Sequence, residues 1–208
     1  MSQTSAKIMF PILAAVVLGA CAPAANPTSA VQPTLAAQPS AAQTATSQPS
    51  DIPLPLPFAL TSSAFEPEGV VPDRYSCKGA DISPELSWGD EPPGTHSLVL
   101  IFDDPSTGGG SWVHWLVYDL PPAARGLPEA VPAGEEIAGG GTHGSNSWGA
   151  LEYGGPCPPQ GTTHRYVFTL YALDTALDLE PGADRGELLA AMEGHTLAEA
   201  ELAASFTR

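Results

Sequence analysis

Three short runs of β-forming residues, separated by turn residues, constrain the fold of this chain more than any other feature. The runs are Ser97–Asp103, Trp112–Tyr118 and Arg165–Tyr171, and each is rich in β-branched, leucine or aromatic side chains. Gly94 precedes the first run and Pro105 follows it, as expected of residues that begin and end strands. Short apolar runs bounded by turn residues are typical of strands, so the sequence predicts an all-β or β-rich domain.

Helical periodicity is confined to the C-terminal part of the chain. Residues 184–193 and residues 197–204 repeat apolar side chains at helical spacing. Gly194 separates the two segments, and Thr196 is a suitable N-cap for the second. Together with the strand runs, this pattern predicts a mainly β protein: a β-sandwich of antiparallel-dominated sheets with short C-terminal helices.

The N-terminus has the features of an export signal. Lys7 is the only charged residue among the first 50, and residues 8–18 form an almost uninterrupted apolar run. This length suits a signal peptide and is too short for a membrane-spanning helix of about 20 residues. The next residues, Leu18-Gly-Ala-Cys21, resemble the lipobox of bacterial lipoproteins. The resemblance implies that residues 1–20 are removed and that Cys21 carries a lipid; the alternative is an ordinary signal peptide and an unmodified cysteine.

Residues 21–57 differ in composition from the rest of the chain. Residues 22–50 contain no charged residue, and residues 22–57 hold eight of the 23 prolines. Such a segment buries too little apolar surface to offset the entropy of ordering it, so we expect a disordered tether. Residues 58–208 are left as one domain of ordinary size. The predicted protein is exported and anchored in the cell envelope as a bacterial lipoprotein.

The charge of the chain excludes two classes of partner. Its 23 acidic and seven basic residues give a net charge of −16 at pH 7, and the basic residues are not clustered. Nucleic-acid binding depends on clustered Lys and Arg, so no nucleic acid is expected as a partner. A polybasic patch for anionic lipids is equally absent from the sequence, and membrane attachment is expected to be covalent.

Common enzyme and metal motifs are missing or fail on context. Residues 139–144 match the dinucleotide pattern G-x-G-x-x-G, but no apolar strand precedes them and a turn-rich segment follows. The sequence has no Walker motif and no G-x-S-x-G, and its five histidines lack the spacing of local metal ligands. We therefore expect no cofactor, no metal and no enzymatic activity; a weak hydrolase with His114 or His164 as its base is the alternative.

Three cysteines allow one disulfide in an exported domain. If Cys21 is lipidated, Cys77 and Cys157 are left, and either they form a disulfide or both are free thiols. The sequence leaves both alternatives open.

An ordered series of short motifs runs through the domain. It consists mainly of Ser83-Pro-Glu-Leu-Ser-Trp88, Asp104-Pro105, His114-Trp115, Tyr153-Gly-Gly-Pro-Cys-Pro-Pro-Gln-Gly161 and His164-Arg-Tyr166. From about Cys77 to Arg208 the series resembles the phosphatidylethanolamine-binding protein family, in its bacterial branch often called Raf kinase inhibitor-like. The resemblance implies a β-sandwich with short C-terminal helices. It also implies a small pocket that binds the phosphate of a phospholipid headgroup or a similar anion.

The resemblance identifies the residues of that pocket, which by motif are Asp104, His114, Pro158, Pro159, His164 and Tyr166. His164 and Tyr166 share one face of a strand because side chains alternate, and with His114 they offer three hydrogen-bond donors to a phosphate. A hydrogen bond to Asp104 would fix the tautomer of His114 or His164 and favour the protonated ring.

One motif departs from the family pattern. The family's turn commonly reads Asp-Pro-Asp-Ala-Pro, whereas this chain has Asp104-Pro-Ser-Thr-Gly108. The change removes a negative charge from the pocket rim and loosens the loop, while the hydroxyl of Ser106 can still contact a phosphate. An altered headgroup preference is the expected consequence.

The remaining histidines and aromatic residues have simpler interpretations. His96, His143 and His195 are expected at the surface or in packing, and Arg165 is expected on the strand face opposite the pocket. Four tryptophans are expected mainly in the core: Trp88, Trp112, Trp115 and Trp148. Of these, Trp112 shares a strand face with His114.

These observations favour an envelope-anchored binding protein whose pocket holds an anionic small molecule, such as a phospholipid headgroup. The alternative is an inhibitor or interaction protein that acts on an envelope enzyme such as a kinase or hydrolase. Because the domain from Phe58 onward carries six basic and 22 acidic residues, its overall field opposes an anion. Binding should therefore strengthen with added salt.

Overall fold

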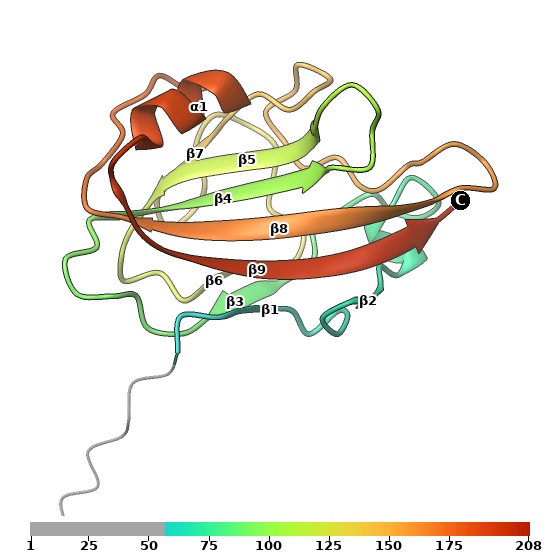
Figure 1. Ribbon diagram of the computed structural model, residues 1–208, viewed down its shortest axis with the longest axis horizontal. Coiled ribbons are helices and arrows are strands. Elements are labelled where there is room, and N and C mark those ends of the chain that lie inside the picture. The colour runs from blue at the N-terminus through green and yellow to red at the C-terminus, as the bar shows by residue number, and fades with distance from the viewer. Residues whose placement is uncertain (1–56) are drawn as a thin grey trace, which may run out of the picture. The chain divides into compact units, whose positions relative to one another are not determined.

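The computed structural model describes residues 57–208 (Figure 1). The predicted signal peptide, the predicted lipidation site Cys21 and the predicted tether up to residue 56 lie outside the described residues. None of the helices in the described part is long and apolar enough to cross a bilayer.

A six-stranded sheet forms the larger layer of the domain, with the strand order β2-β9-β8-β4-β5-β7. The strands are β2 (Gly69–Val70), β4 (Ser97–Asp104), β5 (Trp112–Leu120), β7 (Thr142–His143), β8 (Thr163–Leu173) and β9 (Thr196–Thr207). Neighbouring strands are antiparallel except β2 and β9, which are parallel. All three strand runs of the sequence lie in this sheet, as β4, β5 and β8.

A smaller sheet packs against one face of the larger one and completes the sandwich. It has three antiparallel strands in the order β1-β3-β6. Outside this sheet, a short 3-10 helix, η1 (Asp73–Tyr75), follows β2 in the chain. The strands are β1 (Leu60–Thr61), β3 (Leu86–Trp88) and β6 (Gly126–Leu127). The mainly β sandwich predicted from the sequence is confirmed.

Alternation along β4 explains why this strand is apolar at almost every position. Leu100 and Phe102 belong to the core cluster that also contains residues of the smaller sheet. Val99 and Ile101 point to the other face, where they join a second cluster that includes Leu188 of helix α1 (Arg185–Met192). A strand that is covered on both faces has no solvent-facing position, so it lacks polar alternation.

The predicted helix at residues 184–193 is confirmed as α1. Asp184 is its N-cap and forms a capping box with Glu187, in which each side chain accepts a hydrogen bond from the other's backbone N–H. The helix packs on the outer face of the six-stranded sheet (Figure 1).

The second predicted helix, at residues 197–204, is wrong, and Thr196 is not a helix N-cap. Residues Thr196–Thr207 form β9, which pairs with β8 along nearly its whole length. Alternate residues of β9, from Ala200 through Leu202 to Phe206, face the core. Ala, Leu and Glu favour helices intrinsically, but the sheet partners on both sides of β9 outweigh that preference.

Candidate functional site

A cavity of about 510 Å³ opens at one end of the six-stranded sheet. At this end β4 finishes while β5 and β8 begin, so three strands bring their terminal residues together (Figure 1). The cavity walls include all the predicted pocket residues except Ser106, namely Asp104, His114, Pro158, Pro159, His164 and Tyr166.

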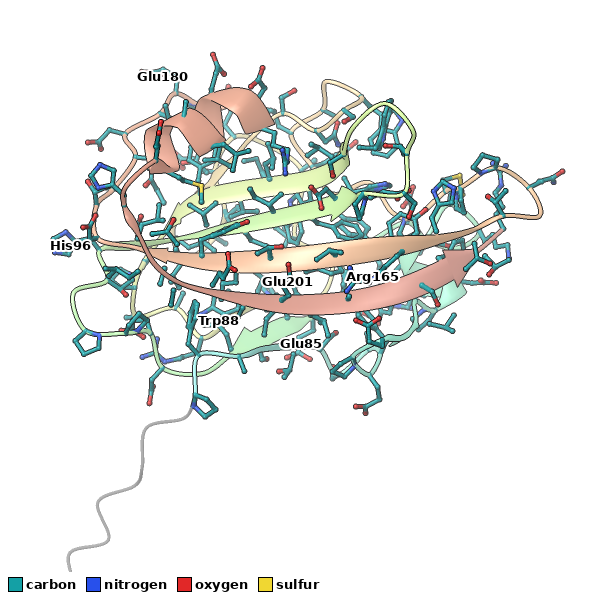
Figure 2. The ribbon with its side chains drawn as sticks, viewed as in Figure 1. Glu85, Trp88, His96, Arg165, Glu180 and Glu201 are labelled. Atoms are coloured by element: carbon teal, nitrogen blue, oxygen red, sulfur yellow. A yellow bond between two sulfur atoms is a disulfide. The ribbon has the colours of Figure 1, made fainter. Side chains whose placement is uncertain are left out.

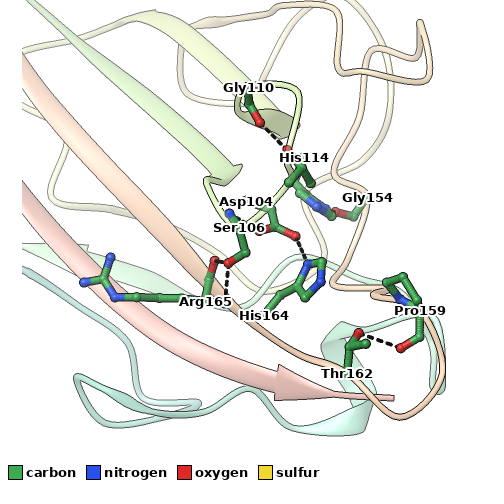
Figure 3. Close-up of polar contacts among 10 residues, drawn as sticks. Asp104, Ser106, Gly110, His114, Gly154, Pro159, Thr162, His164 and Arg165 are labelled. Carbon is green, nitrogen blue, oxygen red and sulfur yellow. Dashed lines mark hydrogen bonds and ion pairs between the residues drawn. The ribbon is translucent and has the colours of Figure 1, made fainter.

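Asp104 and His164 form the central polar contact of the cavity (Figure 3). The Nδ1 atom of His164 donates to Oδ2 of Asp104 at 2.6 Å, and the carboxylate is almost completely buried, with 3% of Asp104 exposed. Its other oxygen, Oδ1, accepts from the backbone N–H of Ser106 at 2.8 Å, as is typical of an Asp-Pro turn. The carboxylate therefore fixes the tautomer of His164 and leaves Nε2 as the ring atom available to a ligand.

His114 lies beside this pair, but its Nδ1 is not hydrogen-bonded to the Asp104 carboxylate. Its Nδ1 donates to the backbone carbonyl of Gly154 at 2.6 Å. Burial lowers the pKa of His114, although the Gly154 carbonyl and the nearby carboxylate of Asp104 act in the opposite direction. A neutral ring whose Nδ1 carries the proton has an unprotonated Nε2. The donor role expected of His114 therefore requires the protonated ring, whereas the neutral ring offers an acceptor.

A β-bulge at His114 directs this side chain into the cavity. Phe102 pairs with Trp115 and Asp103 pairs with Val113, so His114 is an extra residue that has no partner on β4. The side chains of His114 and Trp115 consequently both face the inner side of the sheet, one toward the cavity and the other into the core.

Tyr166 supplies a hydroxyl donor two residues beyond His164 on β8. Burial is the main cause that raises the pKa of Tyr166 well above its usual value, and the charge of Asp104 adds to it. The hydroxyl therefore stays protonated at neutral pH. Arg165, between the two, faces away as expected and pairs with Glu68 at 3.0 Å (Figures 2 and 3).

Ser106 is not among the residues that line the cavity, and its hydroxyl is engaged in a contact between the loop and a strand. Its Oγ accepts from the backbone N–H of Arg165 at 3.0 Å and thereby joins the β4–β5 loop to β8 (Figure 3). The neighbouring Thr107 lines the cavity instead, and its hydroxyl donates to the carbonyl of Gly110. Sequence alone could not decide which of two adjacent hydroxyl residues in a loop faces inward.

A disulfide holds the opposite wall of the cavity. Cys77 and Cys157 are bonded, with 5.5 Å between their Cα atoms, and both line the cavity. Gly155 lies beside them, and a Cβ at this position would come within 2.4 Å of the carbonyl of Tyr75, so only glycine allows this approach. Because both sulfurs are in the disulfide, neither cysteine offers a thiolate nucleophile to the cavity.

Two tryptophans stand at the mouth of the cavity rather than in the core, contrary to expectation. Trp112 is 40% exposed and Trp148 is 53% exposed, and their rings meet edge-on with 5.5 Å between centroids. Trp148 also lies edge-on to His114 at 5.1 Å. Its loop is shaped by Asn146, whose Oδ1 accepts the backbone N–H groups of Trp148 and Ala150, a local pattern that the sequence analysis missed.

The charge lining the cavity is acidic. Asp81, Asp104 and Glu152 line it, whereas no Lys or Arg of the described residues does. Asp81 accepts the backbone N–H of Gly155 at 2.7 Å, so one of its oxygens is used to hold the wall. Across residues 57–208 no group of three metal-ligating side chains lies close enough to hold a metal ion.

The other histidines lie outside the cavity. His143 is buried and its Nδ1 donates to the carbonyl of Gly134 at 2.6 Å, and burial lowers its pKa. His195 pairs with Asp174 at 2.7 Å near the opposite end of the sheet. His96 is exposed.

Relatives of this chain are found in bacteria and archaea. A protein of Methanothermobacter thermautotrophicus named UPF0098 protein is 49% identical over 149 residues, which cover 72% of this chain and 98% of the relative. A protein of Mycobacterium tuberculosis, provisionally named lipoprotein LppC, is 39% identical over 151 residues, with 72% of each chain covered.

A solved structure has the same fold. CT736 of Chlamydia trachomatis, provisionally described as a homologue of phosphatidylethanolamine-binding protein, aligns with a TM-score of 0.67 at 41% identity. The alignment covers 73% of this chain and 97% of that one. The family model of phosphatidylethanolamine-binding protein matches residues 61–207, so this chain belongs to the phosphatidylethanolamine-binding protein family.

Proposed function

We propose that this chain is an envelope-anchored binding protein whose cavity takes a small phosphate-bearing ligand, such as a phospholipid headgroup. The observation that carries the proposal is the Asp104–His164 hydrogen bond beside Tyr166 in one cavity. Asp104 is buried and the side chain of His164 is 17% exposed, so the carboxylate holds the ring in one orientation with Nε2 toward the cavity, as a ligand site requires.

The donors and acceptors in the cavity suit a ligand that is more than a bare anion. The Tyr166 hydroxyl is placed to donate to a phosphate oxygen, and His164 donates from Nε2 when its ring is in the imidazolium form, with Nδ1–H held by Asp104. The neutral His114 offers an acceptor, which fits an N–H of an ammonium group or the P–OH of a phosphomonoester. Carboxylates of Asp81 and Glu152 in the lining also favour a ligand that carries a positive group.

Calorimetric titration with four ligands tests which groups of a ligand the cavity recognises. Phosphoethanolamine, glycerophosphoethanolamine, inorganic phosphate and acetate differ in the ammonium group, the ester linkage and the phosphate. We expect phosphoethanolamine to bind more tightly than inorganic phosphate, and acetate to bind weakest. If none of the four gives a saturable signal, the proposal is wrong.

A matched pair of variants locates the binding. His164→Asn should weaken phosphoethanolamine binding about tenfold or more, because the ring nitrogen that Asp104 orients toward the ligand is lost. His195→Asn breaks a similar histidine–aspartate pair, with Asp174 at 2.7 Å, outside the cavity, and should leave the affinity unchanged. Equal effects of both variants would contradict a site at His164.

The anchor is the second part of the proposal, and it concerns residues that the structure does not describe. It is supported by the lipobox-like sequence that ends at Cys21 and by the relative that is provisionally named a lipoprotein. Cys21→Ser should release the protein from the membrane fraction of expressing cells, and persistence of the variant in that fraction would argue against lipidation.

A further inference from the structure

The exposed aromatic surface of the domain is concentrated at the cavity mouth. Four large hydrophobic side chains are exposed among the described residues: Val70, Trp112, Trp148 and Leu197. Only the two tryptophans lie in contact, with 5.5 Å between ring centroids, and both also line the cavity. Leu197 lies at the start of β9, near the opposite end of the sheet.

The segments around this mouth carry no charge in a strongly acidic domain. Residues 105–112, 144–151 and 154–163 contain no Asp, Glu, Lys or Arg, although the whole chain has a net charge of −16. We call these three segments the rim. Acidic side chains are spread over other parts of the surface, as Glu180 and Glu201 illustrate (Figure 2). The carboxylates that line the cavity lie outside the three segments: Asp104 is buried, whereas Asp81 and Glu152 are exposed.

We propose that the rim docks on the interfacial layer of a phospholipid bilayer, with the cavity mouth facing the lipid headgroups. Tryptophan prefers the membrane–water interface, where its ring is apolar and its indole N–H is still hydrated. An uncharged rim can enter that layer without removing an ion from water, whereas the acidic surface elsewhere cannot. The inference goes beyond the proposed ligand and does not depend on which headgroup the cavity binds.

The charge of the domain selects the kind of membrane surface. A domain with six basic and 22 acidic residues is repelled by anionic lipids, so the surface must be rich in zwitterionic lipids. The predicted lipid on Cys21 would hold the domain near a bilayer at high effective concentration, so weak rim affinity is sufficient.

Vesicle binding tests the docking surface directly. The chain from residue 22 onward, which lacks the predicted lipid, is mixed with phosphatidylcholine vesicles and followed by co-sedimentation and tryptophan fluorescence. We expect binding with a blue shift, because Trp112 and Trp148 are the exposed members of the chain's four tryptophans. Vesicles that contain phosphatidylglycerol should bind more weakly at low salt than at high salt.

Two rim variants and two controls decide whether the rim is responsible. Trp148→Ser should weaken vesicle binding about fivefold. Gly109→Asp places a charge in the rim, where a Cβ meets nothing within 4 Å, and should weaken it by at least as much. Leu197→Ser and Leu197→Asp make the same kinds of change far from the rim and should have no effect.

The Gly109→Asp variant separates this inference from the proposed ligand site. It should retain binding of soluble phosphoethanolamine while it loses vesicle binding, since Gly109 does not line the cavity. The inference is overturned if the folded wild type does not bind phosphatidylcholine vesicles, or if the Leu197 variants weaken binding as much as the rim variants. If the wild type binds vesicles but does not bind phosphoethanolamine, the ligand proposal is wrong and the docking inference is supported.

Discussion

The strands β4 and β8 carry two contrasting pairs of side chains on the same face of the sheet. Phe102 and Phe168 stack with 3.8 Å between ring centroids inside the core. Two residues further along β4 and four residues back along β8, Asp104 and His164 meet at 2.6 Å in the cavity. The backbone geometry is continuous between the two pairs, so the difference lies in what covers them.

The smaller sheet covers the first pair and not the second. Phe102 and Phe168 belong to the cluster that includes Leu86 of β3, so no water reaches them. Toward the end of the strands that cover is replaced by the disulfide-linked wall, and the space becomes a cavity. The site therefore continues the inward-facing positions of β4 and β8. Where the smaller sheet no longer covers these strands, a polar pair takes the place of an aromatic pair.

Removal of the aromatic pair should have the largest effect. Phe168→Ala deletes a stacked, fully buried ring, and we expect the free energy of unfolding to fall by about 3–5 kcal/mol. Chemical denaturation measures this change. A loss below about 1 kcal/mol would mean that the stacked pair is not a core contact.

Neutralisation of the polar pair should affect binding more selectively. Asp104→Asn keeps the size of the side chain but removes the charge that orients His164, so phosphoethanolamine affinity should fall about tenfold. The free energy of unfolding should fall by about 1–3 kcal/mol, because a hydrogen bond to a charged group is lost. Calorimetry and denaturation on the same sample give both values, and unchanged affinity would contradict the role of Asp104.

The features of this region that follow from neighbouring residues in the chain were predicted from the sequence. Strand alternation placed His164 and Tyr166 on one face, and the hydrogen bond from a histidine ring to Asp104 is present at His164. The strand runs and the helix at α1 are also local patterns, and they are found where they were expected.

Features that depend on strand pairing or on the path of a loop could not be predicted from the sequence. The bulge at His114 depends on the register between β4 and β5, and β9 is a strand only because β8 and β2 pair with it. The exposure of Trp148 follows from how its loop turns around Asn146. Each of these depends on partners distant in the chain or on the path of a loop, which periodicity does not encode.

His114 should make the cavity end of the sheet sensitive to acid. Its pKa in the folded protein is below the ordinary value of 6.5, so the unfolded chain binds its proton first as the pH falls. The neutral His114 ring therefore costs no stability above about pH 6.5, and its contribution becomes destabilising as the pH drops toward the lowered pKa. Denaturation at pH 7 and pH 5 should show that the wild type loses more of its free energy of unfolding than His114→Asn does. Parallel losses would contradict a buried neutral ring.

Ser106 provides the smallest expected effect. Ser106→Ala removes the hydrogen bond to the backbone of Arg165 in an exposed loop, and we expect the free energy of unfolding to change by no more than about 1 kcal/mol. Because Ser106 does not line the cavity, phosphoethanolamine affinity should be unchanged. A several-fold loss of affinity would show that this hydroxyl reaches the ligand after all.

The contrast between a covered core and an open polar site is tested most directly by NMR of the histidine rings during a phosphoethanolamine titration. Five histidines give separate signals, and His195, paired with Asp174 outside the cavity, is an internal reference. We predict a saturable shift of the His164 signals, with little change at His195. Saturable binding by calorimetry with no shift at His164 would contradict the assignment of the ligand site to the Asp104–His164 pair.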